Sequence, residues 1–197
     1  MTGIVGNNPF ATRFTRPGAI EFMFSEGQSP ASLVEKLRES RWQGEIVGPH
    51  GVGKSTLLAA LIPHLVTAGR TVVHVTLHAG EKTLPAVCDE WPTWSATTLV
   101  IVDGYEQLTW WSRGKLAKRV KDRGAGLLVT THAPTGLPTL MNVVPQCEVA
   151  EQVVRQLVPD ETLISSDDIH TAYQDCQGNI REMLFALYDL YETRTRS

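Results

Sequence analysis

The octapeptide Gly48-Pro49-His50-Gly51-Val52-Gly53-Lys54-Ser55 matches the pattern G-x-x-x-x-G-K-[ST] at every fixed position. In such a loop, backbone N–H groups surround the β-phosphate of a nucleoside triphosphate, and the glycines permit a close approach that a Cβ would block. The pattern assigns Lys54 to the β- and γ-phosphates and the Ser55 hydroxyl to Mg²⁺. We therefore predict that residues 48–56, from Gly48 to Thr56, bind a nucleoside triphosphate together with Mg²⁺.

The residues on either side of this loop support the same prediction. Glu45-Ile46-Val47 has the character of the end of an apolar strand. Apolar residues then recur at helical spacing after the loop: Leu57, Leu58, Leu61, Ile62 and Leu65. A helix that begins there directs its unpaired N–H groups and the positive end of its dipole at the phosphates.

The composition predicts one domain with a small appendage. The chain has 197 residues, of which 42% are hydrophobic, enough for one substantial core. Its formal net charge of −3 gives no general attraction to nucleic acid or to an anionic membrane. It has no run of 18 apolar residues and no apolar core of a signal peptide, so we expect a cytoplasmic protein without membrane segments. The spacing of Cys88, Cys147 and Cys176 indicates neither disulfides nor a zinc site.

Short apolar runs alternate with helical patterns along the middle of the chain. Such alternation predicts an α/β fold in three layers, with a parallel sheet covered by helices on both faces. The expected strands are 71–77, 99–102, 127–130 and 139–144, together with the one before the phosphate loop. The expected helices are 30–40, the one after the loop, 84–90 and 105–122.

One proline, one glycine and the two ends of the chain complete the expected organisation. Pro63 should kink or shorten the helix after the phosphate loop, and Gly69 should lie just past its end. Residues 20–24 suggest one short strand or an extended arm. After Pro145 only helical patterns remain, at 148–157, 167–176 and 180–193. We therefore expect an N-terminal arm and helix (1–43), a core (44–145) and a helical lid (146–197).

An acidic residue follows the strand at 99–102. Asp103 comes at the carboxyl end of this apolar run, where it can hold the water shell of Mg²⁺ beside Ser55. Hydrolysis also needs a group that orients or deprotonates water, and Glu106 is the nearest carboxylate after Asp103. Its alternative role is that of a solvated glutamate in the first turn of a helix.

These residues resemble a known family. Asp103-Gly104-Tyr105-Glu106-Gln107-Leu108 is similar to the Walker B segment of STAND-type ATPases, D-[ND]-F-E-[HQ]-L, within the AAA+-like (ASCE) branch of P-loop NTPases. The run from Leu127 to Pro134 resembles the strand that follows in that family, which typically ends T-[ST]-R and senses the γ-phosphate. Two positions depart from the family pattern. Gly104 stands where many AAA+ proteins carry a catalytic glutamate, and His132 replaces the sensor arginine, so the resemblance implies slow hydrolysis or a catalytic Glu106.

The C-terminal helices fit the same resemblance. Gly178-Asn179-Ile180-Arg181-Glu182 is similar to the G-[DN]-x-R segment of AAA+ lids, in which the arginine reaches the γ-phosphate. The resemblance assigns that sensor role to Arg181, whereas its alternative is an ordinary surface arginine. STAND proteins normally add a winged helix and repeat domains, so the resemblance implies a short form of the family.

The helix expected at 105–122 has an unusual composition. It carries a basic stretch from 113 to 123, preceded by Trp110 and Trp111. We expect a solvated basic face with both tryptophans packed inward. The alternatives are a nucleic-acid surface and an arginine that reaches the nucleotide of a neighbouring subunit. No residue identifies the base by itself, although the arm from Asn8 to Phe24, with Phe10 and Phe14, is one candidate cover.

Taken together, the motifs predict an ATP-binding protein that is a slow Mg²⁺-dependent ATPase and acts as a molecular switch or motor module. The predicted catalytic residues are Lys54, Glu106, His132 and Arg181, and Ser55 and Asp103 hold the metal. A nucleotide-binding partner module without turnover and a small-molecule kinase remain alternatives. A GTPase is disfavoured because the sequence lacks an [NT]-K-x-D segment. We expect an unidentified protein partner and allow for a homo-oligomer.

Overall fold

The structure is a computed structural model that describes residues 8–159 and 162–196. These residues form two compact units. The sheet unit comprises Phe24–Gly48 and Leu57–Val143. The helical unit comprises residues 8–23, 49–56, 144–159 and 162–196, and it therefore includes the phosphate loop. The domain boundaries expected from the sequence stay predictions.

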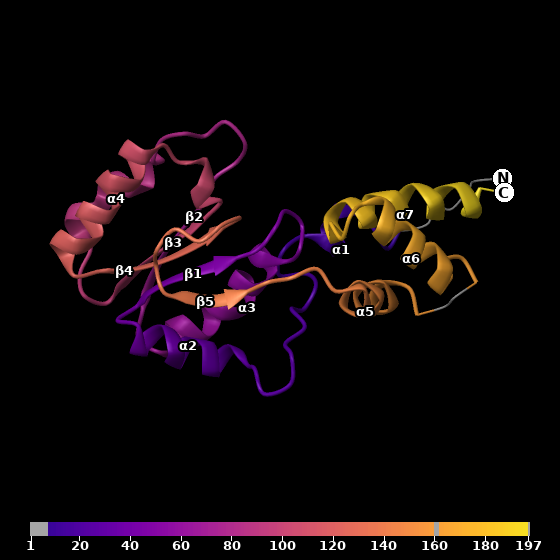
Figure 1. The fold of residues 1–197 in the computed structure, drawn as a ribbon, viewed down its shortest axis with the longest axis horizontal. Coiled ribbons are helices and arrows are strands. Elements are labelled where there is room, and N and C mark those ends of the chain that lie inside the picture. Colours follow the sequence, from indigo (N-terminus) through magenta and orange to yellow (C-terminus); the bar gives the residue numbers. More distant parts are fainter. Residues whose placement is uncertain (1–7, 160–161, 197) are drawn as a thin grey trace. The chain divides into compact units, whose positions relative to one another are not determined.

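The sheet unit contains a five-stranded parallel sheet, as the sequence predicted. Its strands follow the order β2-β3-β4-β1-β5 (Figure 1). Their bounds are β1 (Gln43–Val47), β2 (Thr71–Thr76), β3 (Thr98–Asp103), β4 (Gly126–Thr131) and β5 (Thr139–Asn142). Because all the strands run in one direction, the carboxyl ends of β1, β3 and β4 lie along one edge of the sheet.

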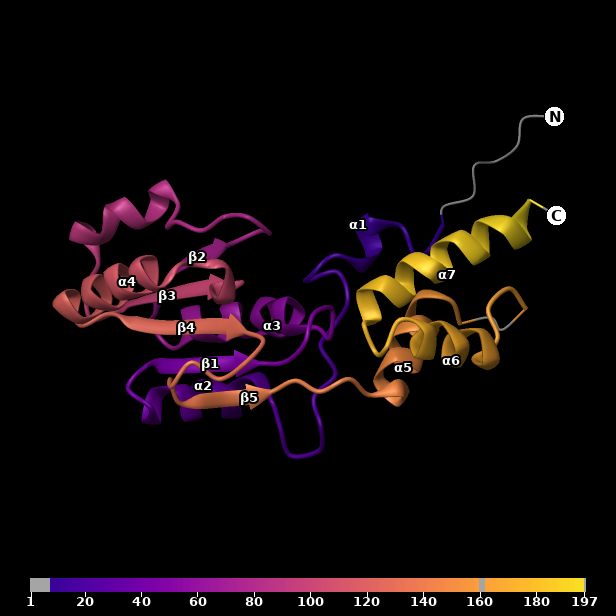
Figure 2. The same ribbon diagram turned by 45° about the horizontal axis from the view of Figure 1, so that its top comes forward.

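Helices cover both faces of this sheet, which makes the unit a three-layer α/β structure (Figure 2). The helix α4 (Trp110–Arg123) lies on one side, and α2 (Pro30–Glu39) and α3 (Lys54–Thr67) lie on the other (Figure 1). Side chains of a strand alternate between the two faces. On the α4 side, apolar side chains of β3 and β4 pack against Leu116 and Val120, together with Cys88 of the 3₁₀ segment η1 (Ala86–Thr93). β3 and β4 are buried along their whole length.

The connection from β4 to β5 is short. Residues 132–138 cross β1 without a helix, although most parallel crossovers contain one. The carboxylate of Glu45 on β1, which is 1% exposed, holds this crossover loop. Its Oε2 accepts hydrogen bonds from Thr135 N at 2.7 Å and from Thr135 Oγ1 at 2.6 Å. The sheet face beside α4 is therefore covered here by a loop.

The helical unit is built from four helices and an apolar cluster of its own. The helices are α1 (Thr12–Thr15), α5 (Cys147–Leu157), α6 (Ser166–Asp175) and α7 (Ile180–Thr195). Ser165 and Asn179 cap α6 and α7, because their side chains accept hydrogen bonds from backbone N–H groups of the first helical turn. Phe10 is 1% exposed within this cluster, with its ring 6.1 Å from that of Tyr191. Phe10 is therefore a core residue, which corrects its interpretation as a cover for the base.

The expected helix at 105–122 was wrong as one continuous element. Tyr105–Gln107 forms a short 3₁₀ segment, η2, and α4 begins separately behind Thr109, whose side chain accepts a hydrogen bond from Ser112 N. The chain turns between the two segments because Leu108 and Thr109 have extended backbone angles.

The helix expected at 84–90 is instead the 3₁₀ segment η1. Residues 21–24 form neither a helix nor a strand, which fits the extended arm among the two alternatives. α3 continues to Thr67, beyond Pro63, and Gly69 follows with a positive φ of 81°. Within the described part of the chain, no helix combines the length and the apolar character needed to cross a membrane.

Candidate functional site

The phosphate loop adopts backbone angles that require glycine. Gly51 has a φ of 72° and Gly53 a φ of 101°, a region that other residues rarely enter. Lys54 begins α3, is 9% exposed, and donates from Nζ to the carbonyl oxygen of Pro49 at 2.6 Å. Ser55 and Thr56 follow in the first turn of this helix. The loop thus has the glycine conformations, the lysine and the helix start that phosphate binding needs.

The lid helix α7 starts beside this loop within the helical unit. A Cβ on Gly51 would lie 1.7 Å from Oδ1 of Asn179, so only glycine leaves room for that side chain. Asn179 also caps α7, because its Oδ1 accepts a hydrogen bond from Glu182 N at 3.2 Å. Arg181, the predicted sensor, is exposed on this first turn. The structure thus brings the loop and the start of α7 together, while the sensor role of Arg181 stays a prediction.

In the sheet unit, Asp103 is held by a neighbouring strand. It ends β3, is 8% exposed, and accepts at Oδ1 a hydrogen bond from Thr130 Oγ1 on β4 at 2.5 Å. The same hydroxyl accepts from Gly104 N at 2.9 Å. Sequence reasoning placed Thr130 only in a sensor strand and missed this contact. A threonine at the end of the neighbouring strand was the available signal.

Gly104 explains one departure from the family pattern. Its φ is 89°, and a Cβ at this position would lie 2.7 Å from the carbonyl oxygen of Leu77. A glutamate directly after Asp103 therefore does not fit this backbone. The next carboxylate along the chain is Glu106, which lies in η2.

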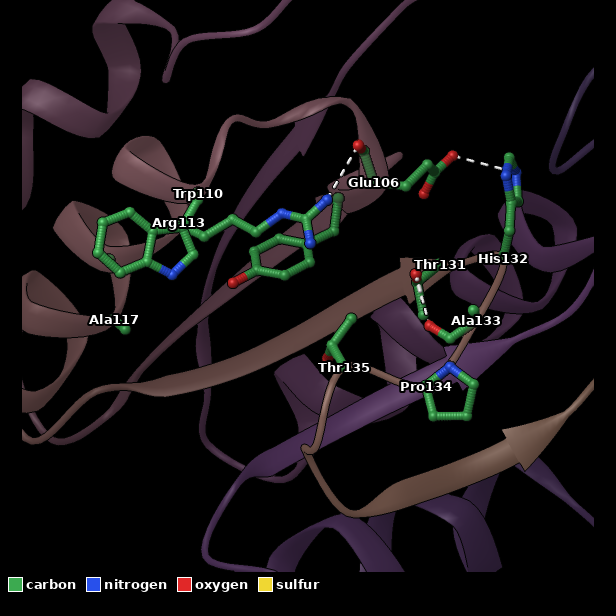
Figure 3. A pocket seen from close by; sticks show the side chains of 11 residues that line it. Glu106, Trp110, Arg113, Ala117, Thr131, His132, Ala133, Pro134 and Thr135 are labelled. Atoms are coloured by element: carbon green, nitrogen blue, oxygen red, sulfur yellow. Dashed lines mark hydrogen bonds and ion pairs between the residues drawn. The ribbon is translucent and has the colours of Figure 1, made fainter.

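Glu106 and His132 form a pair. Their Oε1 and Nε2 atoms lie 3.1 Å apart, and the two side chains are 21% and 29% exposed (Figure 3). The second oxygen of Glu106, Oε2, is buried and has no hydrogen-bond partner among the described residues. The two predicted catalytic residues of this unit therefore meet, with one carboxylate oxygen left to accept a proton or a hydrogen bond.

Arg113 fixes the backbone around Glu106. Its Nη2 donates to the Glu106 carbonyl oxygen at 2.9 Å and its Nε to the Leu108 carbonyl oxygen at 3.0 Å. Its guanidinium also lies over the Tyr105 ring, 5.0 Å from the centroid. Burial raises the pKa of the Tyr105 hydroxyl, and the charge of Arg113 opposes that rise. These contacts assign Arg113 to the support of η2.

Trp110 and Trp111 do not pack inward, which corrects the sequence prediction. They are 75% and 77% exposed at the start of α4. The helix buries Leu116 and Val120 instead, while residues 110 and 111 precede its first buried apolar position. In the predicted base-binding arm, Phe22 lies beside the phosphate loop, where a Cβ on Gly53 would be 3.8 Å from its ring.

Comparison with known proteins supports the fold. No family model matches the sequence, and no curated protein matches it. By structure, the chain is similar to a DNA replication initiation factor, with a TM-score of 0.59 and 13% identity over 89% of this chain and 66% of that one. It is also similar to a RuvB variant from Thermotoga maritima, with a TM-score of 0.53 and 12% identity over 83% and 60% of the chains.

A third similar structure is a Walker-type ATPase of Pyrococcus abyssi, with a TM-score of 0.50 and 11% identity over 88% and 71% of the chains. The chain thus spans slightly less than two thirds of the first two proteins. At these identities the likeness concerns the fold alone, which is the three-layer α/β fold of P-loop NTPases.

Proposed function

We propose that this protein binds Mg-ATP at the phosphate loop and hydrolyses it slowly, as a molecular switch or motor module. The observation that carries the proposal is the pair of Glu106 and His132, which joins a carboxylate to a sensor-strand residue at 3.1 Å. Both come shortly after strands whose carboxyl ends share one edge of the sheet with the strand before the phosphate loop. The pair therefore supplies the acidic group that hydrolysis needs in order to activate water, and that nucleotide binding alone would not require.

The residues fit magnesium and a triphosphate. Lys54 would neutralise the β- and γ-phosphates, and the Ser55 hydroxyl and the Asp103 carboxylate would hold the metal. Asp103 suits a hard cation because it is an oxygen ligand whose orientation Thr130 fixes. Magnesium, when bound, would neutralise charge that develops on the phosphate oxygens.

In this proposal Glu106 positions the attacking water. Its buried Oε2 would accept a proton from that water while Oε1 stays with His132. The oxygen of the water then forms a bond to the γ-phosphorus, and the bond to the ADP leaving group breaks. His132 and Arg181 would sense the γ-phosphate, His132 in the place of the sensor arginine. Arg181 lies on the helix turn that Asn179 joins to the loop.

Phosphate release from ATP by the purified protein tests the proposal. We expect slow, Mg²⁺-dependent release that Lys54→Ala lowers at least about 100-fold, the usual size of effect when a transition-state charge partner is removed. Lys115→Ala, at an exposed position of α4, is the matched control and should retain the activity. Equal activity of Lys54→Ala and the unaltered protein would contradict the assignment.

The same assay separates the alternatives. Tight Mg-ATP binding without phosphate release over several hours would favour a partner module without turnover. ADP release that depends on an added nucleoside or metabolite would favour a small-molecule kinase. Neither result is expected, because a carboxylate held beside the sensor-strand residue His132 suits the activation of water.

A further inference from the structure

Two neighbouring tryptophans at the start of α4 are the largest exposed aromatic feature in the described part of the chain. Trp110 is 75% and Trp111 77% exposed, and their ring centroids lie 4.7 Å apart at 72°. Large aromatic side chains dominate binding energies when a partner covers them. An exposed pair of tryptophans therefore indicates an interaction surface.

An open groove runs along α4 from Trp110. It consists of two adjoining hollows of about 610 and 660 Å³, which share Tyr105, Ala117 and Thr135. α4 forms one wall and the crossover loop forms the other; Figure 3 shows the half that contains Trp110 and Ala117. The groove exists because the crossover from β4 to β5 is a loop, held by Glu45, where a helix could otherwise cover the sheet.

The wall that α4 contributes is one stripe of the helix. Trp110, Gly114, Ala117 and Lys121 follow each other at intervals of three or four residues and therefore lie on one face. Gly114 and Ala117 are exposed and small, so a partner can approach the α4 backbone closely. With 14 residues, α4 is about 20 Å long, which is also the length of a four-turn helix.

The charge of this region is opposite to that of the whole chain. α4 carries six basic residues and one acidic residue, in a protein with a formal net charge of −3. Arg113 and Arg119 are bonded to backbone carbonyls, whereas Lys115, Lys118 and Lys121 are exposed. Arg41 and Lys121 line the same hollow of the groove.

We propose that this α4 groove binds an acidic amphipathic helix of about 14 residues from a partner protein. The apolar face of that helix would cover Trp110 and Ala117, and its carboxylates would lie beside Lys118 and Lys121. Binding does not require the proposed function. An effect on turnover would rest on that function, because Glu106 and His132 line one end of the groove.

The shape and lining of the groove favour a helix over nucleic acid or a membrane. On the stripe of α4 that lines the groove, the positions between Trp110 and Lys121 are the small residues Gly114 and Ala117, so this stripe carries no row of cations that could follow a phosphate backbone. The Arg113 guanidinium in this wall is already bonded to two carbonyl oxygens. A flat membrane surface cannot enter the groove beside Trp110.

Peptide display on the complete chain, without nucleotide, tests the proposal. A library of helix-favouring 14-residue peptides is selected on the protein, and the most enriched peptide is labelled with fluorescein for anisotropy titration. We expect enriched peptides with one apolar face and acidic flanks. Trp110→Ser and Ala117→Trp should each weaken binding at least tenfold, and Lys121→Glu at least fivefold. Ala117→Trp fills the groove from an exposed position without altering charge.

Two substitutions on the helical unit are matched controls. Phe185→Ser removes an exposed aromatic side chain, and Arg16→Glu reverses an exposed charge, so both should leave the peptide affinity unchanged. Failure to enrich acidic amphipathic peptides would overturn the proposal. It would also be overturned if the Ala117→Trp variant bound the selected peptide as tightly as the unaltered protein does. Two other ligands are tested in the same way: a single-stranded 15-mer of deoxythymidine and anionic vesicles. If the protein binds either of them and Trp110→Ser abolishes that binding, the proposal is overturned in favour of that ligand.

Discussion

Thr130→Val tests how Asp103 is held. Thr130 is 1% exposed, and its hydroxyl donates to Asp103 Oδ1 at 2.5 Å and accepts from Gly104 N at 2.9 Å. Valine has nearly the same shape but neither donates nor accepts. The substitution therefore removes two hydrogen bonds at the end of β3 without creating a cavity.

The expected destabilisation follows from these two bonds. A hydrogen bond to a charged group contributes about 1.5–3 kcal/mol to stability, and one between neutral groups about 0.5–1.5 kcal/mol. We therefore expect Thr130→Val to lower the free energy of unfolding by about 2–4 kcal/mol. Thr130→Ser keeps the hydroxyl and loses one methyl group, which costs about 1 kcal/mol.

Urea denaturation of both variants, followed by circular dichroism and by tryptophan fluorescence, measures these values. Where the two probes coincide, the midpoints give the difference in the free energy of unfolding. In a chain of this size, the valine variant should melt about 5–15 °C below the unaltered protein. Equal stability of the valine and serine variants would refute the reasoning, because the hydroxyl would then contribute nothing.

Three further predictions concern other positions. Gly104→Ala should destabilise the protein by at least about 2 kcal/mol more than Gly69→Ala, because both positions have positive φ but only a Cβ on Gly104 meets the backbone, and thermal denaturation compares them. Arg194 hydrogen bonds hold the pKa of the Asp168 carboxyl well below its usual range. This depressed pKa stabilises the fold above about pH 4, so Arg194→Gln should be less stable at pH 7 and the difference should shrink as the pH falls below 4. Glu106→Gln should lower phosphate release at least about 100-fold while the Mg-ATP affinity, measured by calorimetry, changes less than threefold.

The sequence predicted most of the fold because the decisive signals are local. The apolar runs of β3 and β4 are buried on both faces, and such runs need no knowledge of distant contacts to be identified as strands. The capping residues of α6 and α7 were likewise identifiable by type. By contrast, the interruption between η2 and α4 depends on the extended backbone angles of Leu108 and Thr109, which hydrophobic spacing does not encode.

The contacts within the candidate site were less predictable, because they join residues far apart in the chain. The hydrogen bond from Thr130 to Asp103 and the pair of Glu106 with His132 both depend on β3 and β4 being neighbours. The exposure of Trp110 could not be inferred from its residue type, since tryptophan is usually well buried. It depends on which face of α4 meets the sheet.

Gly104 and Glu106 together explain how the site can keep a carboxylate that many AAA+ proteins carry directly after the aspartate. The contact of residue 104 with the Leu77 carbonyl leaves no room for a side chain, so the acidic group cannot follow Asp103 directly. The turn at Gly104 then leads into η2, and Arg113 fixes the Glu106 carbonyl while His132 meets its carboxylate. Loss of Arg113 should therefore displace the Glu106 backbone and with it the carboxylate that activates water. Arg113→Lys retains the charge but not the two-pronged contact, and it should lower phosphate release while Lys115→Arg does not.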